Sequence, residues 1–250
     1  PLAYPFSRMM QITEPTMNQS LKLSLPLSEV PTTIARLVFQ SAERFAGRTA
    51  IEDNGQCTDY AELPERVMGF ARGLMALGIQ AGDRVGIWAP NSGDWILAAL
   101  GIQCAGAVLV PINTRMKGLE AADVLERSGC RLLFVPQRFL DVDYPALLAP
   151  HRPASLEHLV LLDGDTPGLS SDLTLAQFLL GAATIDADSA RQRALAVGPE
   201  AMPGVSATAC WSAVSCASVS GAFLGVSTAS RNGPLVPGPN ASLSWSYATR

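Results

Sequence analysis

Four short apolar segments constrain the fold of this chain more than any other feature. Their starting residues are Arg84, Ala107, Leu132 and Leu159. The separations are 23, 25 and 27 residues, and helix-like segments fill the first two intervals, over Asp94–Gln103 and Leu119–Ser128. A strand, a helix and a strand at this spacing are typical of βαβ units, whose crossovers are right-handed. The sequence therefore predicts a layered α/β domain with a largely parallel sheet and flanking helices.

The segment before these strands also carries local structure signals. Apolar spacing predicts an amphipathic helix over Thr33–Phe45, and Thr49–Glu52 has the pattern of a short strand. Asn54 and Gly55 indicate a tight turn into a second short strand.

Asp59 is expected to open the next helix, because its spacing to Glu62 matches a capping box. Pro64 would then be the fifth helical residue and would loosen the first turn. Gly69 and Gly73, one turn apart, predict a close approach of this helix to a sheet.

Three further signals lie along the chain. Gly78 is a stop signal for the preceding helix. Two shorter helices are expected over Tyr144–Leu148 and Leu173–Leu180. Trp95–Ile112 is almost uncharged and about long enough to span a membrane. Interrupting Gly and Pro residues and the run Val108–Val110 favour a buried helix, turn and strand instead.

Composition excludes several classes of protein. Apolar content of 48% with 16% charged residues is typical of a globular chain, and a net charge of −4 gives no electrostatic case for nucleic acid or an anionic membrane. Five cysteines at irregular spacing form neither a disulfide framework nor a zinc pattern. With no signal-peptide pattern either, we expect a reduced, cytoplasmic setting. The first residue is Pro1 and not Met, so a fragment is expected.

The last fifty residues differ abruptly from the rest. Residues 201–250 hold ten Ser and nine Ala but two charged residues, Arg231 and Arg250. We therefore divide the chain into an irregular lead-in over 1–30, a partial α/β domain over 31–200, and an aberrant tail over 201–250. A translational frame change near Glu200 would produce such a tail, and a low-complexity tail is the alternative.

Asn113, Thr114 and Arg115 are the most site-like group of residues. They follow the end of a predicted strand, where open α/β sheets place their ligands. The simpler interpretation is that Asn113 or Thr114 caps the next helix while Arg115 pairs with an acid.

Other residues that could carry chemistry have simpler structural interpretations. His151 and His158 both lie near turns, and a Cys–His pair from Cys57 or Cys130 stays open. Paired acids around Gly164, at Asp163 and Asp165, could bind a cation, but a plain turn fits better. No G-x-G-x-x-G motif opens a helix after a strand.

Three motifs in order carry a family resemblance: YAEL, GDRVGIWAPN and GAVLVPINTR. Together they closely resemble the N-terminal part of the AMP-forming acyl-CoA synthetases, over about residues 30–200. The resemblance implies an ATP-dependent acid–CoA ligase that uses ATP, Mg and coenzyme A, and releases AMP and pyrophosphate. KGLEAADVL and DYPALL look most like bacterial catabolic ligases that act on medium-chain fatty acids or steroid-derived carboxylates.

The resemblance also implies what is missing. The family's phosphate loop, which ends in Pro-Lys-Gly, is expected soon after Gly198-Pro199-Glu200, yet the chain has two lysines, Lys22 and Lys117. We therefore expect no catalytic, cofactor-binding or metal-binding residue here, and a truncated, inactive ligase. One alternative is a pseudoenzyme that associates with proteins, including itself. Another is an unrelated hydrolase or redox enzyme on a similar fold.

Overall fold

The computed structural model describes residues 32–164 and 172–199, so the expectations for residues 1–30 and 201–250 lie outside the described residues. The helices are α1 (Ile34–Phe45), α2 (Leu63–Ala76), α3 (Gly93–Cys104), α4 (Gly118–Ser128), α5 (Tyr144–Leu148), α6 (Leu175–Gly181) and α7 (Ala187–Ala196). The short 3-10 turns are η2 (Ala149–His151) and η3 (Ala182–Thr184). The strands are β1 (Thr49–Asp53), β2 (Gln56–Asp59), β3 (Arg84–Ile87), β4 (Val108–Pro111), β5 (Cys130–Val135), β6 (Arg138–Phe139), β7 (Val142–Asp143), β8 (His158–Leu161) and β9 (Asp172–Thr174).

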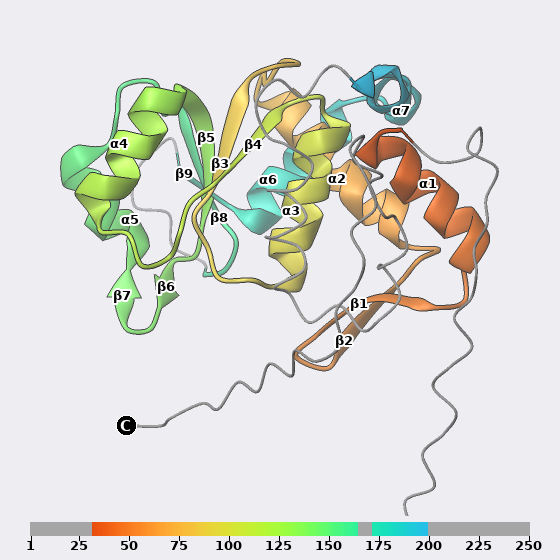
Figure 1. The fold of residues 1–250 in the computed structure, drawn as a ribbon, viewed down its shortest axis with the longest axis horizontal. Coiled ribbons are helices and arrows are strands. Elements are labelled where there is room, and N and C mark those ends of the chain that lie inside the picture. The colour runs from red at the N-terminus through yellow and green to blue at the C-terminus, as the bar shows by residue number, and fades with distance from the viewer. Residues whose placement is uncertain (1–31, 165–171, 200–250) are drawn as a thin grey trace, which may run out of the picture. The chain divides into compact units, whose positions relative to one another are not determined.

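A five-stranded sheet forms the centre of the fold, in the order β4-β3-β5-β8-β9 (Figure 1). All four strand pairs are parallel, and Val85 of β3 lies opposite Leu109 on one side and Leu132 on the other. The predicted α/β fold with a parallel sheet is therefore confirmed, as are the four predicted strands. The fifth strand, β9, and the β6–β7 hairpin have no counterpart in the sequence prediction.

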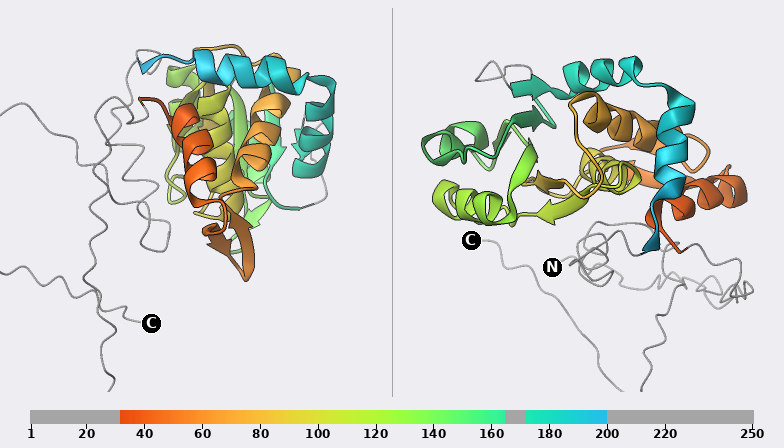
Figure 2. Two further views of the ribbon diagram at one scale, coloured as in Figure 1. Left: turned by 90° about the vertical axis from the view of Figure 1, so that its right-hand side faces the viewer. Right: turned by 90° about the horizontal axis from the view of Figure 1, so that it is seen from above.

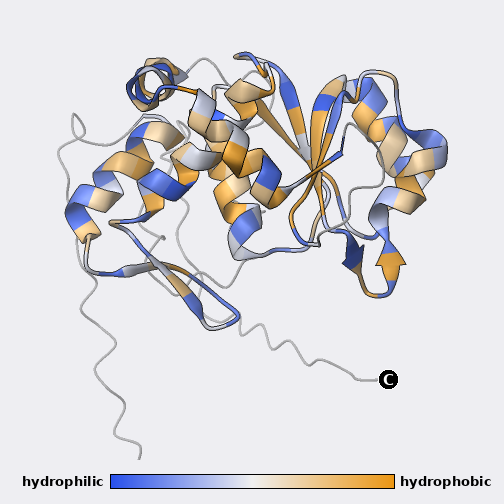
Figure 3. Cartoon of the chain, turned by 180° about the vertical axis from the view of Figure 1, so that it is seen from behind, coloured by the Kyte–Doolittle hydropathy of each residue, from blue (hydrophilic) through white to orange (hydrophobic). Residues whose placement is uncertain are grey.

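Helices cover both faces of the sheet. α4 and α5 lie on one side, and α1, α2, α3, α6 and α7 lie on the other (Figure 1). Hydrophobic ribbon is concentrated in the sheet and in α3 (Figure 3). Alternation along β5 supplies both cores: Leu133 and Val135 belong to the α4 side, whereas Phe134 contacts Phe70 and Phe178 of the other helix layer.

An arginine fixes the last described helix to this layer. α7 lies across the ends of the other helices (Figure 2). Arg193 donates from Nε to the Ala105 carbonyl at 2.9 Å and from a terminal nitrogen to the Ile79 carbonyl at 3.0 Å. These two carbonyls follow α3 and α2, so one guanidinium joins the ends of three helices.

The expected close approach of α2 to a sheet is wrong, because the neighbours are helices. A Cβ at Gly73 would lie 2.5 Å from the Phe178 ring of α6, and Gly69 faces Leu179. At the crossing with α3, a Cβ at Gly101 would lie 2.4 Å from the Phe70 Cβ and 3.2 Å from the Ala71 nitrogen. Glycine therefore sets the spacing between helices in this layer.

The predicted start of α2 is also wrong. The helix begins at Leu63 with Glu62 as its N-cap, and Asp59 ends β2, where it accepts a hydrogen bond from the Thr49 hydroxyl. Pro64 consequently lies in the first turn, where its missing N–H breaks no helical hydrogen bond. The first turn is therefore not loosened by Pro64.

Several other local predictions are confirmed. Asn54 and Gly55 both have positive φ in the β1–β2 turn, and Gly78 ends α2 at a φ of 74°. The segment Trp95–Ile112 forms most of α3, a turn and β4. Within 32–164 and 172–199, none of the helices combines the length and apolar character needed to cross a membrane. The helix expected over Leu173–Leu180 starts two residues later, because its first residues belong to β9.

One ion-pair network joins the amino-terminal ends of three strands and makes stability depend on pH. Arg131 bonds Asp83 and also Glu157, at 2.8 and 2.7 Å to the two Glu157 oxygens. The hydrogen bond from Arg131 lowers the pKa of Glu157. The pKa of Asp83 is lowered as well: burial alone would raise it, but the hydrogen bonds from the Gln80 N–H and from Arg131 outweigh burial. Carboxyl groups with a lowered pKa stabilise the fold above their unfolded pKa, and this contribution is lost as the pH falls through their folded pKa.

We therefore expect Arg131→Met to flatten the pH dependence of stability. Between pH 6 and pH 3, the parent chain should lose roughly 1 kcal/mol more unfolding free energy than the variant, a modest value because Glu157 is nearly half exposed. Urea unfolding followed by circular dichroism measures this difference. Arg127→Met, which removes an exposed pair, is the matched control. Equal losses in the parent chain and Arg131→Met would contradict the network.

Candidate functional site

The carboxyl ends of the parallel strands define the candidate site. After β3 the chain adds β4 on one side and then crosses to add β5 on the other. In open α/β sheets this reversal opens a crevice at the carboxyl edge, and ligands bind there. Four segments follow the strand ends at this edge: residues 88–92, 113–115, 136–138 and 162–164.

The loop Asn113–Arg115 is held at this edge by buried aromatic residues. The Trp88 indole Nε1–H donates to the Asn113 carbonyl at 3.1 Å, and the Tyr144 hydroxyl donates to the Thr114 carbonyl at 3.0 Å. The two rings meet edge-on with their centroids 4.6 Å apart. The loop also closes on itself, because the Asn113 side chain accepts from the Arg115 N–H at 2.9 Å.

The structure corrects the simpler interpretation of this loop. The N-cap of α4 is Lys117, so neither Asn113 nor Thr114 caps the helix. Arg115 is exposed, and the ion pairs found among the described residues do not include it. Sequence reasoning placed the loop correctly but missed Trp88 and Tyr144, which lie 25 and 30 residues from their partners.

The two long helices that follow β3 and β4 are α3 and α4, and a carboxylate occupies the N-terminus of each. The Glu120 side chain accepts from the Lys117 N–H at 2.8 Å, at the start of α4. At the start of α3, Asp53 accepts from the Gly93 N–H at 2.8 Å, beside the Ser92 cap. Burial raises the pKa of Asp94 in the same turn, with Arg66 opposing and Asp53 adding to the rise. Helix N-termini bind phosphate through free N–H groups, and negative charge at both positions repels it.

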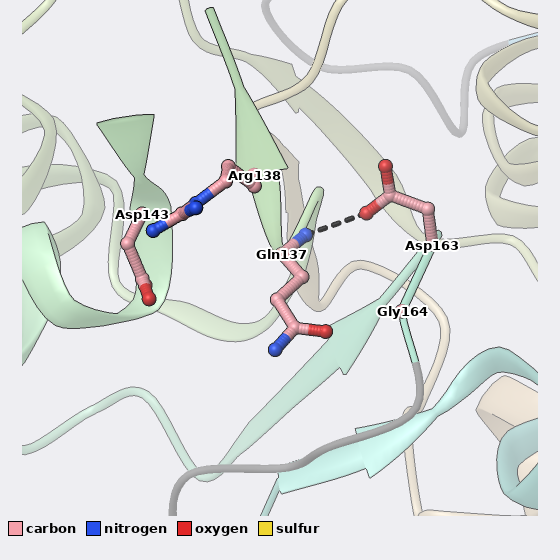
Figure 4. A pocket seen from close by; sticks show the side chains of 5 residues that line it. All are labelled: Gln137, Arg138, Asp143, Asp163 and Gly164. Carbon is pink, nitrogen blue, oxygen red and sulfur yellow. Dashed lines mark hydrogen bonds between the residues drawn. The ribbon is translucent and has the colours of Figure 1, made fainter. Parts of the chain in front are cut away.

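A polar hollow of about 390 Å³ lies beyond β5 and β8, lined by Gln137, Arg138, Asp143, Asp163 and Gly164 (Figure 4). The Asp163 carboxylate accepts from the Gln137 N–H at 2.6 Å. The Asp143 carboxylate accepts from the Ala146 N–H at 2.9 Å and so caps α5. The carboxylates of Asp143 and Asp163 therefore each accept a hydrogen bond from the backbone, and Gly164 has a φ of 86°. The rest of the turn expected around Gly164, including Asp165, lies outside the described residues.

Among the described residues, no hydrogen bond is found between a histidine and a cysteine. His151 is exposed in η2, whereas His158 opens β8 soon after the turn at Ala154 and Ser155 and is half-buried, so both lie near turns as expected. Burial lowers the pKa of His158, although Glu157 opposes this. Cys130 is buried with a raised pKa and contacts the Ser128 hydroxyl at 3.2 Å, and Cys57 is exposed on β2.

The part of the chain that the structure describes offers no site that fits a bound nucleotide or its metal. Within 32–164 and 172–199, no group of three or more His, Cys, Asp or Glu side chains is arranged to hold a metal ion. The helix N-termini described above are closed by carboxylates. The described edge therefore offers fixed backbone loops and exposed cations such as Arg115, but no cradle for phosphates.

Comparison with known proteins gives a consistent set of relatives. Residues 38–195 match the family described as AMP-binding enzyme. A 3-[(3aS,4S,7aS)-7a-methyl-1,5-dioxo-octahydro-1H-inden-4-yl]propanoyl:CoA ligase of Mycobacterium tuberculosis is 39% identical over 171 residues, which are 68% of this chain and 32% of the relative. The ligase of the same name from Rhodococcus jostii is 36% identical, over 70% of this chain and 34% of its own. The chain thus spans about a third of the length of these relatives.

More distant relatives are also CoA ligases, and the chain again matches only part of their length. The human mitochondrial medium-chain acyl-CoA ligase ACSF2 is 32% identical over 54% of this chain and 25% of its own. Among solved structures, the anthranilate CoA ligase AuaEII superposes with a TM-score of 0.54 at 24% identity, over 65% of this chain and 30% of that one. A long-chain fatty-acid CoA ligase of Archaeoglobus fulgidus gives 0.51 at 20% identity, over 63% and 31%. These two structures support the fold.

Proposed function

Because the chain belongs to the family of AMP-binding enzymes, we propose that it is the N-terminal part of an ATP-dependent, AMP-forming acid–CoA ligase that does not catalyse by itself. In the whole ligase, a carboxylate and ATP would give an acyl-adenylate and pyrophosphate, and coenzyme A would then take the acyl group. The likeness to two ligases at 36% and 39% identity supports the reaction class.

The substrate of the parent enzyme would be either a fused-ring, steroid-derived acid with a propanoate side chain or a medium-chain fatty acid. The names of the Mycobacterium, Rhodococcus and human relatives support these two choices. A bacterial catabolic role in the cytoplasm is part of the same proposal. So is the division into a lead-in over 1–30, a partial ligase domain over 31–200, and an aberrant tail over 201–250.

One observation supports the inactivity of these 250 residues: carboxylates already bind the N–H groups at the helix N-termini along the carboxyl edge of the sheet. Asp53 and Glu120 occupy the positions at which an α/β fold would bind phosphate. The sequence holds no lysine after Lys117, so none lies where the family's phosphate loop is expected. At the described edge ATP would therefore find no free backbone cradle for its phosphates, and such a cradle stabilises phosphoryl transfer.

The expected result is that the purified chain shows no carboxylate-dependent exchange of pyrophosphate into ATP. Exchange reports the first half-reaction alone and needs no coenzyme A, so it isolates the missing phosphate site. A full-length relative such as the Rhodococcus ligase is the positive control. Exchange clearly above a no-protein blank would refute the inactivity.

A second candidate function is protein association without catalysis. Among the described residues, Leu119, Leu140 and Leu180 are mostly exposed, at 64%, 79% and 75%, and each would gain from burial against a partner or a second copy. Sedimentation velocity separates the two candidates. A stable complex without nucleotide binding favours association, whereas a monomer favours an inactive fragment.

A further inference from the structure

The Asn113–Met116 loop is fixed from the interior of the protein in an unusual way. Carbonyl groups of exposed loops normally accept hydrogen bonds from water. Here two successive carbonyls, of Asn113 and Thr114, accept from Trp88 and Tyr144, whose side chains are almost completely buried. A buried indole N–H or phenol O–H needs a partner, so each aromatic residue is committed to its carbonyl.

The two donors come from different parts of the fold. Trp88 directly follows β3, and its own backbone N–H donates to the Phe134 carbonyl of β5 at 2.9 Å. Tyr144 begins α5 and donates its backbone N–H to the Gln137 carbonyl at 3.2 Å. The loop that follows β4 is therefore joined to β3, β5 and α5 at one point, and the edge-on contact of the two rings connects both donors.

Of the four loop residues, only Met116 packs against the core, and it does so while partly buried. Asn113 and Arg115 are exposed and Thr114 is half-buried, so the aromatic donors order a surface segment. Two internal bonds complete the order: Arg115 N–H to the Asn113 side chain at 2.9 Å, and Met116 N–H to the Asn113 carbonyl at 3.0 Å. Ordering a surface loop at the carboxyl edge of a sheet is what prearranged binding sites require.

We propose that Trp88 and Tyr144 are positioning residues, which hold the Asn113–Met116 loop in a single conformation with Arg115 presented at the carboxyl edge of the sheet. The loop's use within a ligase rests on the proposed function. The conformational role rests on the geometry of this chain alone.

The test compares Tyr144→Phe, Trp88→Phe and the double variant in the full chain. Tyr144→Phe removes one hydroxyl and keeps the ring, so the core packing stays filled. Tryptic cleavage after Arg115, followed by mass spectrometry, reports how often the loop opens, provided that opening and closing are faster than cleavage. Loss of one hydrogen bond should speed this cleavage about five-fold in each single variant. Two independent five-fold effects would multiply to about twenty-five-fold. Because the two rings are in contact, we expect the double variant to show a smaller increase than this product.

A spectroscopic measurement separates positioning from a general effect on stability. In Tyr144→Phe the Trp88 indole proton should exchange faster with water, while amide protection in β5 and β8 stays unchanged. Tyr60→Phe, the same change at a buried tyrosine on another part of the fold, should leave cleavage after Arg115 at the parent rate.

Two results would overturn the proposal. One is an unchanged cleavage rate after Arg115 in folded Tyr144→Phe. The other is an equal rise in cleavage at every tryptic site, which would show a loss of overall stability. If Trp88→Phe does not fold, Tyr144→Phe and the indole exchange rate decide the matter alone. Pyrophosphate exchange does not enter these measurements, so an error in the proposed function would leave their outcome intact.

Discussion

Replacing Gly101 with valine should unfold the chain or lower its free energy of unfolding by at least roughly 3 kcal/mol. A Cβ at this position would lie 2.4 Å from the Phe70 Cβ, and 3.2 Å from both the Ala71 nitrogen and the Val67 oxygen. Two of these neighbours are backbone atoms of α2, so no side-chain rotation relieves the overlap, and the helices must move apart. Urea unfolding followed by circular dichroism measures the loss.

Gly47→Val is the matched control, because a Cβ at Gly47 meets no atom within 4 Å. Its unfolding free energy should stay within about 0.5 kcal/mol of the parent value. If both valine variants lose the same amount, the α2–α3 crossing does not depend on Gly101, and the argument from close approach is wrong.

Arg152→Ala should lower the free energy of unfolding by roughly 3 kcal/mol. Arg152 donates to the Asp172 carboxylate at 2.8 Å, and the Asp172 side chain is 3% exposed. Removing the guanidinium takes a cationic partner away from a carboxylate at the start of β9 that is almost completely buried, and the loss of one partner of a buried ion pair is strongly destabilising. Since Asp172 lies opposite Leu159 of β8, amide exchange should rise first along this edge of the sheet.

The comparison is Arg127→Ala, which removes the same side chain from an exposed pair. Arg127 and Asp123 are 2.9 Å apart on α4, with side chains 72% and 59% exposed, so the expected change is about 0.5 kcal/mol or less. Similar losses in the two alanine variants, measured by urea unfolding, would show that burial of Asp172 does not govern the effect.

Strand and helix types followed from the sequence wherever apolar periodicity is local. The spacing of the apolar segments predicted β3, β4, β5 and β8, and Asn54-Gly55 predicted the turn between β1 and β2. The start of α2 was mistaken because Asp59 can both cap a helix and end a strand. Its strand partner Thr49 is ten residues away, beyond the reach of a capping pattern.

The candidate site was predicted in part. The position of Asn113–Arg115 at a strand end follows from the βαβ pattern, but the residues that fix the loop do not. Tyr144 belongs to a short helix on the α4 side, and Trp88 reads as an ordinary buried residue after a strand. Their polar atoms meet the loop through tertiary packing, which has no sequence period. The glycines of α2 were read correctly as a close approach, but the identity of the neighbouring element was not available from the helix itself.

The strand order sets a delay during synthesis of this chain. β3 is the first strand of the central sheet to be made, yet it lies between β4 and β5, and β5 ends at Val135. At ribosomal speeds of 5–20 residues per second, the residues from Arg84 to Val135 take roughly 3 to 10 s to emerge. During that interval at least one edge of β3, with its apolar run Val85–Trp88, lacks its partner strand. Nascent chains are therefore open to wrong pairing with other chains, and binding by a chaperone over this window would improve the yield of folded protein.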